Sequence, residues 1–274
     1  MVLPPLAPDD LTDDVDGSRY RVGLVAPISP AVPAYPVHED DEPGSLSIPL
    51  LPGERTQARR VKFLVANGCT VTSIMLGLTS VFLSLGGHLH WAAALLLACV
   101  VLDGLDGALA RRFGVASPFG AQMDSMHDMS SFGVATPVLV FSWLHGAAPL
   151  WLLAPACALV GVCAAIRLAR FNVSPKDGRY FCGVPTTIAA AIMAATVLVS
   201  PTVGGPLRIV VVAALALLMV STFPYVKVAQ LRRVPLWLWL LPTVGALVNY
   251  EVTFALMVVT YLASGPILWA RKAN

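Results

Sequence analysis

Four aspartates lie within 26 residues and form two pairs, Asp103 with Asp106 and Asp124 with Asp128. The pairs are spaced by three and four residues, so on helices each pair projects from one face. The neighbouring bases Arg111 and Arg112 are too few to neutralise four carboxylates. Divalent cations can do so, and oxygen ligands suit Mg²⁺, Mn²⁺ or Ca²⁺. Two such ions about 3.5–4 Å apart are typical of phosphoryl-transfer sites.

Small residues follow the first pair. Gly107 and Ala110 lie four and seven residues after Asp103, on the same helical face, where they allow a ligand or another backbone to come close. A competing interpretation is an ion-coupled transporter, in which the acids form buried salt bridges or an ion pathway. A transporter of that kind would show repeated halves with interrupted helices, and the second half of the sequence has no further Asp motif.

The overall composition predicts where this site lies. Of 274 residues, 57% are hydrophobic and only 12% are charged, against about 45–50% and about 25% in soluble domains. The sequence therefore predicts an integral membrane protein. A net charge of +2 does not favour a nucleic-acid partner.

The first part of the chain differs from the rest. Ten of the sixteen acids and ten of the 22 prolines lie in the first 54 residues, which have no helical or strand periodicity. We expect residues 1–58 to form a disordered, acidic, Pro-rich cytoplasmic tail, followed by a membrane-embedded domain over 59–274.

Apolar runs in that domain predict an all-α, polytopic transmembrane bundle. Eight spans are expected, near 63–85, 90–110, 122–145, 149–169, 183–200, 206–224, 235–248 and 252–270. Six is the alternative, since the last two runs could form a re-entrant hairpin. With both termini in the cytoplasm, 17 of the 18 Lys and Arg residues lie on that side and only Arg208 lies outside.

The aspartates also carry a family resemblance. The pattern Asp103-x2-Asp106-Gly107-x2-Ala110-Arg111-x8-Gly120-x3-Asp124-x3-Asp128 resembles the signature of the CDP-alcohol phosphotransferases, with Asn67 and Thr70 matching an upstream Asn-x2-Thr. The segments FGAQMDSMHDMSSFGVATP, IRLARFNV and FCGVPTTIAAA are similar to the branch of CDP-diacylglycerol–serine O-phosphatidyltransferases, the phosphatidylserine synthases. Two positions depart: Ala66 replaces a common proline, and His127 stands where that branch usually has a small residue.

The resemblance implies a reaction. A phosphatidyl group passes from CDP-diacylglycerol to the hydroxyl of L-serine, with release of CMP and use of Mg²⁺ or Mn²⁺, with Ca²⁺ as a further candidate and two ions per site. Glycerol 3-phosphate, inositol phosphate or another alcohol are the alternative acceptors. A different enzyme class, the aromatic prenyltransferases, would place two Asp-rich motifs far apart in the chain. The resemblance further implies a homodimer in the plasma membrane, with its active site facing the cytoplasm.

The same resemblance assigns roles to residues. The metal ligands would be Asp103, Asp106, Asp124 and Asp128, and Asp128 is also the candidate catalytic base. The CDP moiety would be bound by Asn67, Thr70, Asp106, Gly107, Ala110, Arg111 and Gly120. The acceptor would meet Arg167, Arg170, Asn172 and His127.

Overall fold

The computed structural model describes residues 56–173, 180–200, 204–226 and 249–273, and they are nearly all helical. The expected all-α class is confirmed for this part of the chain, where the only strands are two of three residues each. The predicted span 235–248 and almost all of the predicted tail lie outside the described residues.

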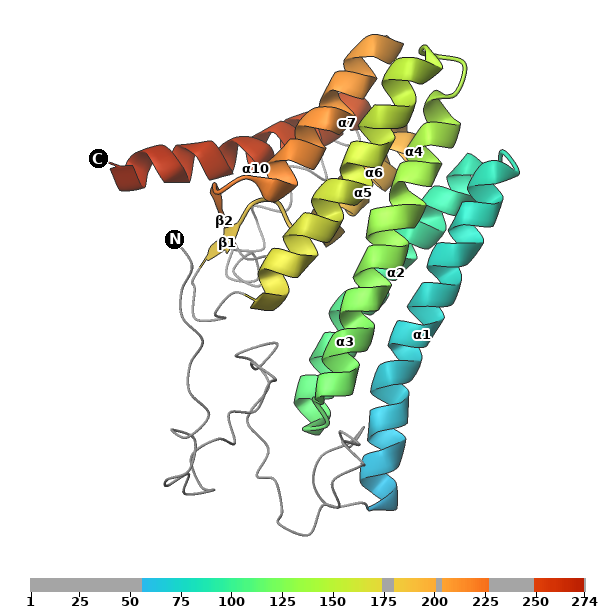
Figure 1. The fold of residues 1–274 in the computed structure, drawn as a ribbon, viewed down its shortest axis with the longest axis vertical. Coiled ribbons are helices and arrows are strands. Elements are labelled where there is room, and N and C mark those ends of the chain that lie inside the picture. The colour runs from blue at the N-terminus through green and yellow to red at the C-terminus, as the bar shows by residue number, and fades with distance from the viewer. Residues whose placement is uncertain (1–55, 174–179, 201–203, 227–248, 274) are drawn as a thin grey trace, which may run out of the picture.

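The N-terminal half consists of long helices that run side by side (Figure 1). They are α1 (Gln57–Leu85), α2 (Leu89–Phe113), α3 (Pro118–His127), the π-helix η1 (Asp128–Ala135), α4 (Thr136–Leu144) and α5 (Leu150–Val173). α3, η1 and α4 follow one another without a break, so 118–144 forms one helical run. This run packs against both α1 and α5.

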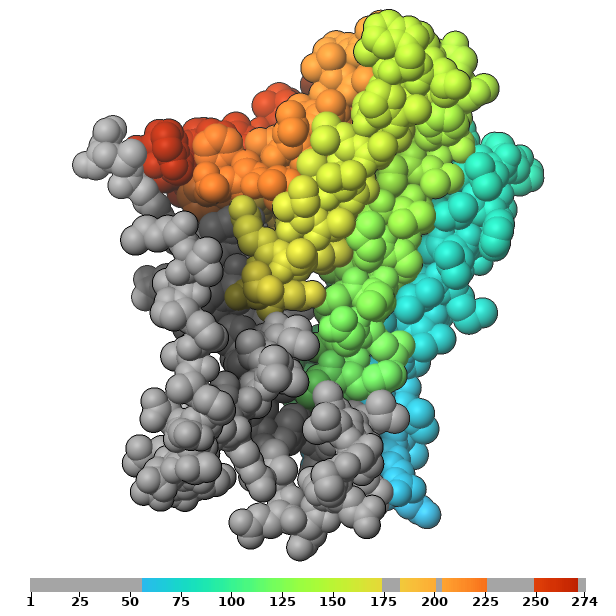
Figure 2. Space-filling model, viewed as in Figure 1, coloured from blue at the N-terminus to red at the C-terminus, as the bar shows by residue number. Residues whose placement is uncertain are grey.

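The C-terminal half adds shorter elements and one long helix. They are β1 (Tyr180–Cys182), α6 (Thr186–Val199), α7 (Gly205–Val220), β2 (Pro224–Val226) and α10 (Tyr250–Ala273). β1 and β2 pair antiparallel, with Phe181 opposite Tyr225. α7 packs along α5 (Figures 1 and 2). α10 runs across the direction of the other helices (Figure 1).

Four described helices are long and apolar enough to cross a membrane: α1, α2, α5 and residues 250–270 of α10. α6 and α7 are apolar but shorter. Large apolar side chains are exposed on these helices, among them Phe82 and Trp151, each 73% exposed. A lipid bilayer would cover such surfaces, and the helices fit a membrane protein. Eight crossings and cytoplasmic termini remain predictions.

The turn between α2 and α3 is shorter than the gap between the predicted spans 90–110 and 122–145, since both helices extend into that gap. α2 continues to Phe113 and stops at Gly114, whose φ of +63° favours glycine, and the Val115 N–H bonds the Ala110 carbonyl. Ser117 then caps α3 by accepting from the Gly120 N–H at 3.0 Å. These two signals place the ends of α2 and α3 next to each other.

η1 and α1 approach each other closely at Gly77. A Cβ added to Gly77 would overlap the side chain of Ser131, so only glycine allows this approach. The hydroxyl of Thr136 bonds the carbonyl of Ser131, five residues earlier, within the wider π-helical turn. π-helical turns occur frequently at functional sites, and this one begins at Asp128.

Candidate active site

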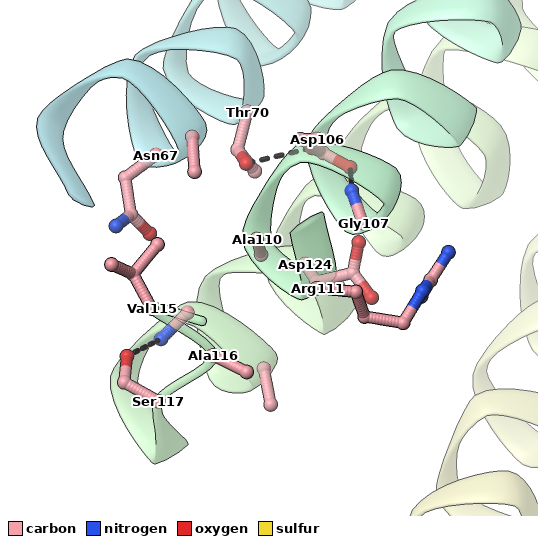
Figure 3. Close-up of a pocket in the computed structure, with 13 residues that line it drawn as sticks. Asn67, Thr70, Asp106, Gly107, Ala110, Arg111, Val115, Ala116, Ser117 and Asp124 are labelled. Carbon is pink, nitrogen blue, oxygen red and sulfur yellow. Dashed lines mark hydrogen bonds between the residues drawn. The ribbon is translucent and has the colours of Figure 1, made fainter. Parts of the chain in front are cut away.

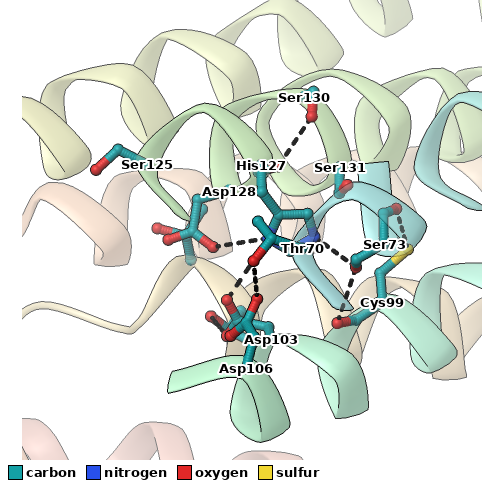
Figure 4. A network of polar contacts seen from close by, with 12 residues as sticks. Thr70, Ser73, Cys99, Asp103, Asp106, Ser125, His127, Asp128, Ser130 and Ser131 are labelled. Carbon is teal, nitrogen blue, oxygen red and sulfur yellow. Dashed lines mark hydrogen bonds and ion pairs between the residues drawn. The ribbon is translucent and has the colours of Figure 1, made fainter. Parts of the chain in front are cut away.

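The four aspartates lie where α2 ends and the α3–η1 run begins. Asp103 and Asp106 come from the last turns of α2, and Asp124 and Asp128 come from α3 and the start of η1. Asp103 Oδ1 and Asp128 Oδ1 both face Nδ1 of His127, at 3.6 and 3.8 Å (Figure 4). The structure thus brings Asp103, Asp124 and Asp128 together at His127, whereas Asp106 is turned toward Thr70 and Gly107.

A pocket of about 260 Å³ opens beside this cluster (Figure 3). All seven residues predicted to bind the CDP moiety line it: Asn67, Thr70, Asp106, Gly107, Ala110, Arg111 and Gly120. Val115, Ala116 and Ser117 of the short turn close one side. Asp124 lines the pocket too, so this residue joins the pocket to the carboxylate cluster.

Asp106 is held rigidly at the pocket wall. Its side chain is only 5% exposed, the Thr70 hydroxyl donates to its Oδ2 at 2.7 Å, and the Gly107 N–H donates to its Oδ1 at 2.6 Å. The contact with Thr70 links α1 to α2. Buried carboxylates need such donors, because an unpaired charge in a low-dielectric site is costly.

Asn67 and Arg111 lie on opposite sides of the pocket. The Asn67 amide nitrogen donates to the Phe63 carbonyl, which leaves its Oδ1 toward Gly120. The exposed guanidinium of Arg111 lies beside Gly107, which has no side chain to exclude it. Arg111 can therefore present several donors to phosphate oxygens.

The residues of the cluster fit a divalent cation. One ligand atom each from Asp103, Asp124 and His127 lie within 4.8 Å of one another. Ligands of one Mg²⁺ or Ca²⁺ ion are at most about 4–5 Å apart, since the bonds are about 2.0–2.6 Å long. Asp128 Oδ1 is buried and has no hydrogen-bond partner within the described part of the chain. A cation would satisfy this oxygen and offset the repulsion among the carboxylates.

The acceptor candidates lie at the end of α5 and make contacts with α6, α7 and α3. Arg167 is 8% exposed and its Nη1 donates to the Thr186 hydroxyl of α6. Arg170 donates to the carbonyls of Val220 and Ser221, at the end of α7. The Asn172 amide bonds Ser125 of α3 at 3.2 Å. Their role in acceptor binding stays a prediction.

His127, the fourth acceptor candidate, is a buried residue, and its role in acceptor binding also stays a prediction. Its ring is completely buried, with Nε2 2.6 Å from the Ser73 hydroxyl and Nδ1 3.6 Å from Asp103. Phe132 packs edge-on against the ring. The structure therefore places His127 inside the carboxylate cluster, among α1, α2 and η1.

Two hydroxyl residues at the site received no role from the sequence. The Thr187 hydroxyl, from the start of α6, donates to Asp103 Oδ2 at 3.4 Å, and Ser73 of α1 contacts His127. Thr187 belongs to the segment FCGVPTTIAAA, which carried part of the resemblance. That segment was the available signal, but single hydroxyl residues in an apolar helix do not reveal their partners.

Fold and site together define a helical protein that has helices long and apolar enough to cross a membrane and a carboxylate cluster beside a pocket of ligand size. The model of the CDP-alcohol phosphatidyltransferase family matches residues 63–223, and the chain belongs to this family. The matched region runs from α1 to the residue before β2 and contains every residue of the site described above.

Curated relatives narrow the comparison. The chain is 37% identical over 146 residues to a CDP-diacylglycerol–serine O-phosphatidyltransferase of Mycobacterium leprae, covering 50% of this chain and 48% of the relative. For the enzyme of the same name in Helicobacter pylori the identity is 35%, with 50% and 58% covered. An archaetidylserine synthase of Methanothermobacter thermautotrophicus is 39% identical, with 42% and 49% covered. The chain thus spans about half the length of the curated relatives it matches.

Proposed function

We propose that this protein transfers the phosphatidyl group of CDP-diacylglycerol to the hydroxyl of L-serine, forming phosphatidylserine and CMP. The observation that carries the proposal is that all seven residues predicted to bind CDP line one pocket. Asp124 joins this pocket to the carboxylate cluster. The names of the relatives support serine as the acceptor.

The CDP moiety would occupy the pocket. Gly107, Ala110 and Gly120 leave room for it, and Arg111 would donate to phosphate oxygens. Asn67 Oδ1 is available as an acceptor on the opposite wall. These groups bind and orient the donor substrate so that its diphosphate lies toward Asp124.

The metal would be held by Asp103, Asp106, Asp124 and Asp128, as one or two Mg²⁺ or Mn²⁺ ions. When bound, a divalent cation at this position would offset the charge of the diphosphate and make CMP a better leaving group. Thr70 would orient Asp106, and Thr187 would orient Asp103, through the hydrogen bonds seen in the structure.

Asp128 would act as the general base. Its buried Oδ1 would take the proton of the serine hydroxyl as the hydroxyl oxygen attacks the phosphorus that carries the diacylglycerol. The new bond joins that oxygen to phosphorus, and the bond from phosphorus to the oxygen bridging to CMP breaks. The products are phosphatidylserine and CMP.

Arg167 would bind the carboxylate of serine. Its Nε is buried and has no hydrogen-bond partner among the residues that the structure describes. A buried guanidinium with a spare donor suits a carboxylate ligand. Glycerol 3-phosphate or inositol phosphate would instead bring a dianion, and Arg170 lies one turn away.

The surroundings of the site follow from the charge pattern. We propose that both termini and the active site face the cytoplasm, that the chain crosses the plasma membrane eight times, and that two copies form a homodimer. Arg111 and Arg112 at the end of α2 and Arg59, Arg60 and Lys62 at the start of α1 support this orientation.

The test is a reconstitution with purified full-length protein in detergent. CDP-diacylglycerol is supplied with Mn²⁺ or Mg²⁺ and, separately, with L-serine, glycerol 3-phosphate, inositol phosphate or glycerol. CMP release and the lipid product are both measured. We expect serine to give phosphatidylserine. Product from another acceptor alone overturns the choice of serine, and no CMP release with any acceptor overturns the transferase proposal.

A further inference from the structure

The Nδ1 atom of His127 is a buried polar atom that the proposed reaction does not use. The ring is 0% exposed, and Nδ1 has no hydrogen-bond partner in the described part of the chain. It lies 3.6 Å from Asp103 Oδ1 and 3.8 Å from Asp128 Oδ1, between the two aspartate pairs (Figure 4). A buried nitrogen without a partner is costly unless something occupies the space that it faces.

The other side of the ring is held by a side chain of α1. The Ser73 hydroxyl donates to the Cys99 carbonyl at 3.4 Å and lies 2.6 Å from His127 Nε2. This short contact anchors the Nε2 edge of the ring to α1 and leaves Nδ1 facing the carboxylates. When the ring is neutral and Nε2–H donates to Ser73, the lone pair of Nδ1 is free to bind a cation.

Nδ1 faces Oδ1 of Asp103 and Oδ1 of Asp128, so a cation at this point would meet one nitrogen and two oxygen ligands. The ligand atoms of Asp103, Asp124 and His127 already lie within 4.8 Å of one another. The hydrogen bond to Ser73 is the arrangement that orients ligating histidines in metal sites, where the second ring nitrogen donates to a fixed acceptor.

We propose that Nδ1 of His127 is a further ligand of the divalent cation, so that the site is a mixed imidazole and carboxylate centre. This inference rests on the proposed metal-dependent function but adds a ligand to it. Imidazole favours transition metals, whereas an all-oxygen site serves Mg²⁺ and Ca²⁺ as well. His127 therefore biases this site toward Mn²⁺ over Mg²⁺, and Ser73 is the residue that positions it.

The experiment uses the full-length protein in detergent, with Mn²⁺ alone as the probe. Pulsed electron paramagnetic resonance of bound Mn²⁺ detects coupling to a directly bonded imidazole nitrogen. We expect this coupling in the wild type. When the histidines are labelled with ¹⁵N, the signal should change from that of a ¹⁴N nucleus to that of a ¹⁵N nucleus. The labelled wild type requires no substitution, so the test stands even if a variant fails to fold.

Variants then show which histidine supplies the coupled nitrogen. His127→Ala should lose the coupling and weaken Mn²⁺ binding about 10-fold or more, with Mg²⁺ binding changed by about threefold or less. His88→Ala is the matched control, because His88 is exposed and precedes α2 at the end opposite the aspartates. Ser73→Ala should keep the coupling but weaken Mn²⁺ binding, since only the orienting partner is lost.

The outcomes separate this inference from the proposed function. Bound Mn²⁺ without a nitrogen coupling overturns the ligand assignment, even if the protein releases CMP in the presence of serine. A coupling that disappears in His127→Ala supports the assignment, even if no acceptor yields a lipid product. A wild-type protein that binds no Mn²⁺ overturns both.

Discussion

The hydroxyl of Thr70 on α1 donates a 2.7 Å hydrogen bond to Oδ2 of Asp106 on α2 inside the candidate nucleotide pocket. The two residues are 36 positions apart in the chain, so this contact sets the spacing of two helices and the orientation of a carboxylate at once. The helix spacing and the carboxylate orientation both depend on the hydroxyl of Thr70, a residue that is only 4% exposed.

Thr70→Val tests this contact, because it keeps the shape of the side chain and removes the donor. A buried hydrogen bond to a charged group contributes about 1.5–3 kcal/mol, so we expect kcat/KM for CDP-diacylglycerol to fall about 10- to 100-fold. Thr72→Val is the control on the exposed face of the same helix. Equal effects in both variants would contradict a specific role for Thr70.

Removal of divalent ions should abolish activity reversibly. Dialysis against EDTA is expected to stop CMP release, since the carboxylates of the cluster would repel the diphosphate without a cation between them. Addition of Mn²⁺ or Mg²⁺ should restore it. CMP release that persists in EDTA would show that the carboxylates act without a metal.

Asp128→Asn should separate chemistry from binding. A general base contributes about 10²–10⁴-fold to rate, so we expect kcat to fall by about that factor. Binding of CDP, measured by calorimetry, should change little, because Asp128 does not line the nucleotide pocket. Glu251→Gln, an acid at the start of α10, is the control for loss of one negative charge. Retained turnover in Asp128→Asn would remove this residue from the role of base.

Gly120→Ala should narrow the pocket. The added Cβ would lie 3.4 Å from Asn67 Oδ1 and from Ser117 Oγ, on the pocket wall. We expect CDP affinity to fall about 10-fold, a change that amounts to roughly 1.4 kcal/mol. Gly104→Ala is the matched control at an exposed position of α2, where the new Cβ meets no atom within 4 Å. An unchanged affinity in Gly120→Ala would argue against CDP in this pocket.

Arg167→Lys should affect the acceptor more than the donor. A lysine keeps the charge but loses the planar set of donors that reaches Thr186 and a carboxylate together. We expect KM for serine to rise about 10-fold and KM for CDP-diacylglycerol to stay nearly constant. Arg208→Lys, at the start of α7 beside Trp143, serves as control. A rise in KM for CDP-diacylglycerol alone would place Arg167 in the donor site instead.

Much of the site could be predicted because its parts are local in sequence. The aspartate pairs follow helix periodicity, and Gly107, Ala110 and Arg111 lie within eight residues of Asp103. Their gathering in one pocket with Asn67 and Thr70 depends on α1 packing against α2, which the resemblance implied. The predicted spans leave a longer gap between α2 and α3 than the structure has, because hydropathy does not detect the helix stop at Gly114 or the helix cap at Ser117.

By itself, the sequence determined the all-helical class, the apolar helices and the residue types of the acidic centre, because composition and a period of 3.6 residues are properties of the chain alone. Only the tertiary structure decided which side chains meet. The hydroxyls of Ser73 and Thr187 reach His127 and Asp103 across 54 and 84 residues. No local pattern specifies such contacts, since they depend on the packing of α1 against α3 and of α6 against α2. The same packing buries His127 among the carboxylates.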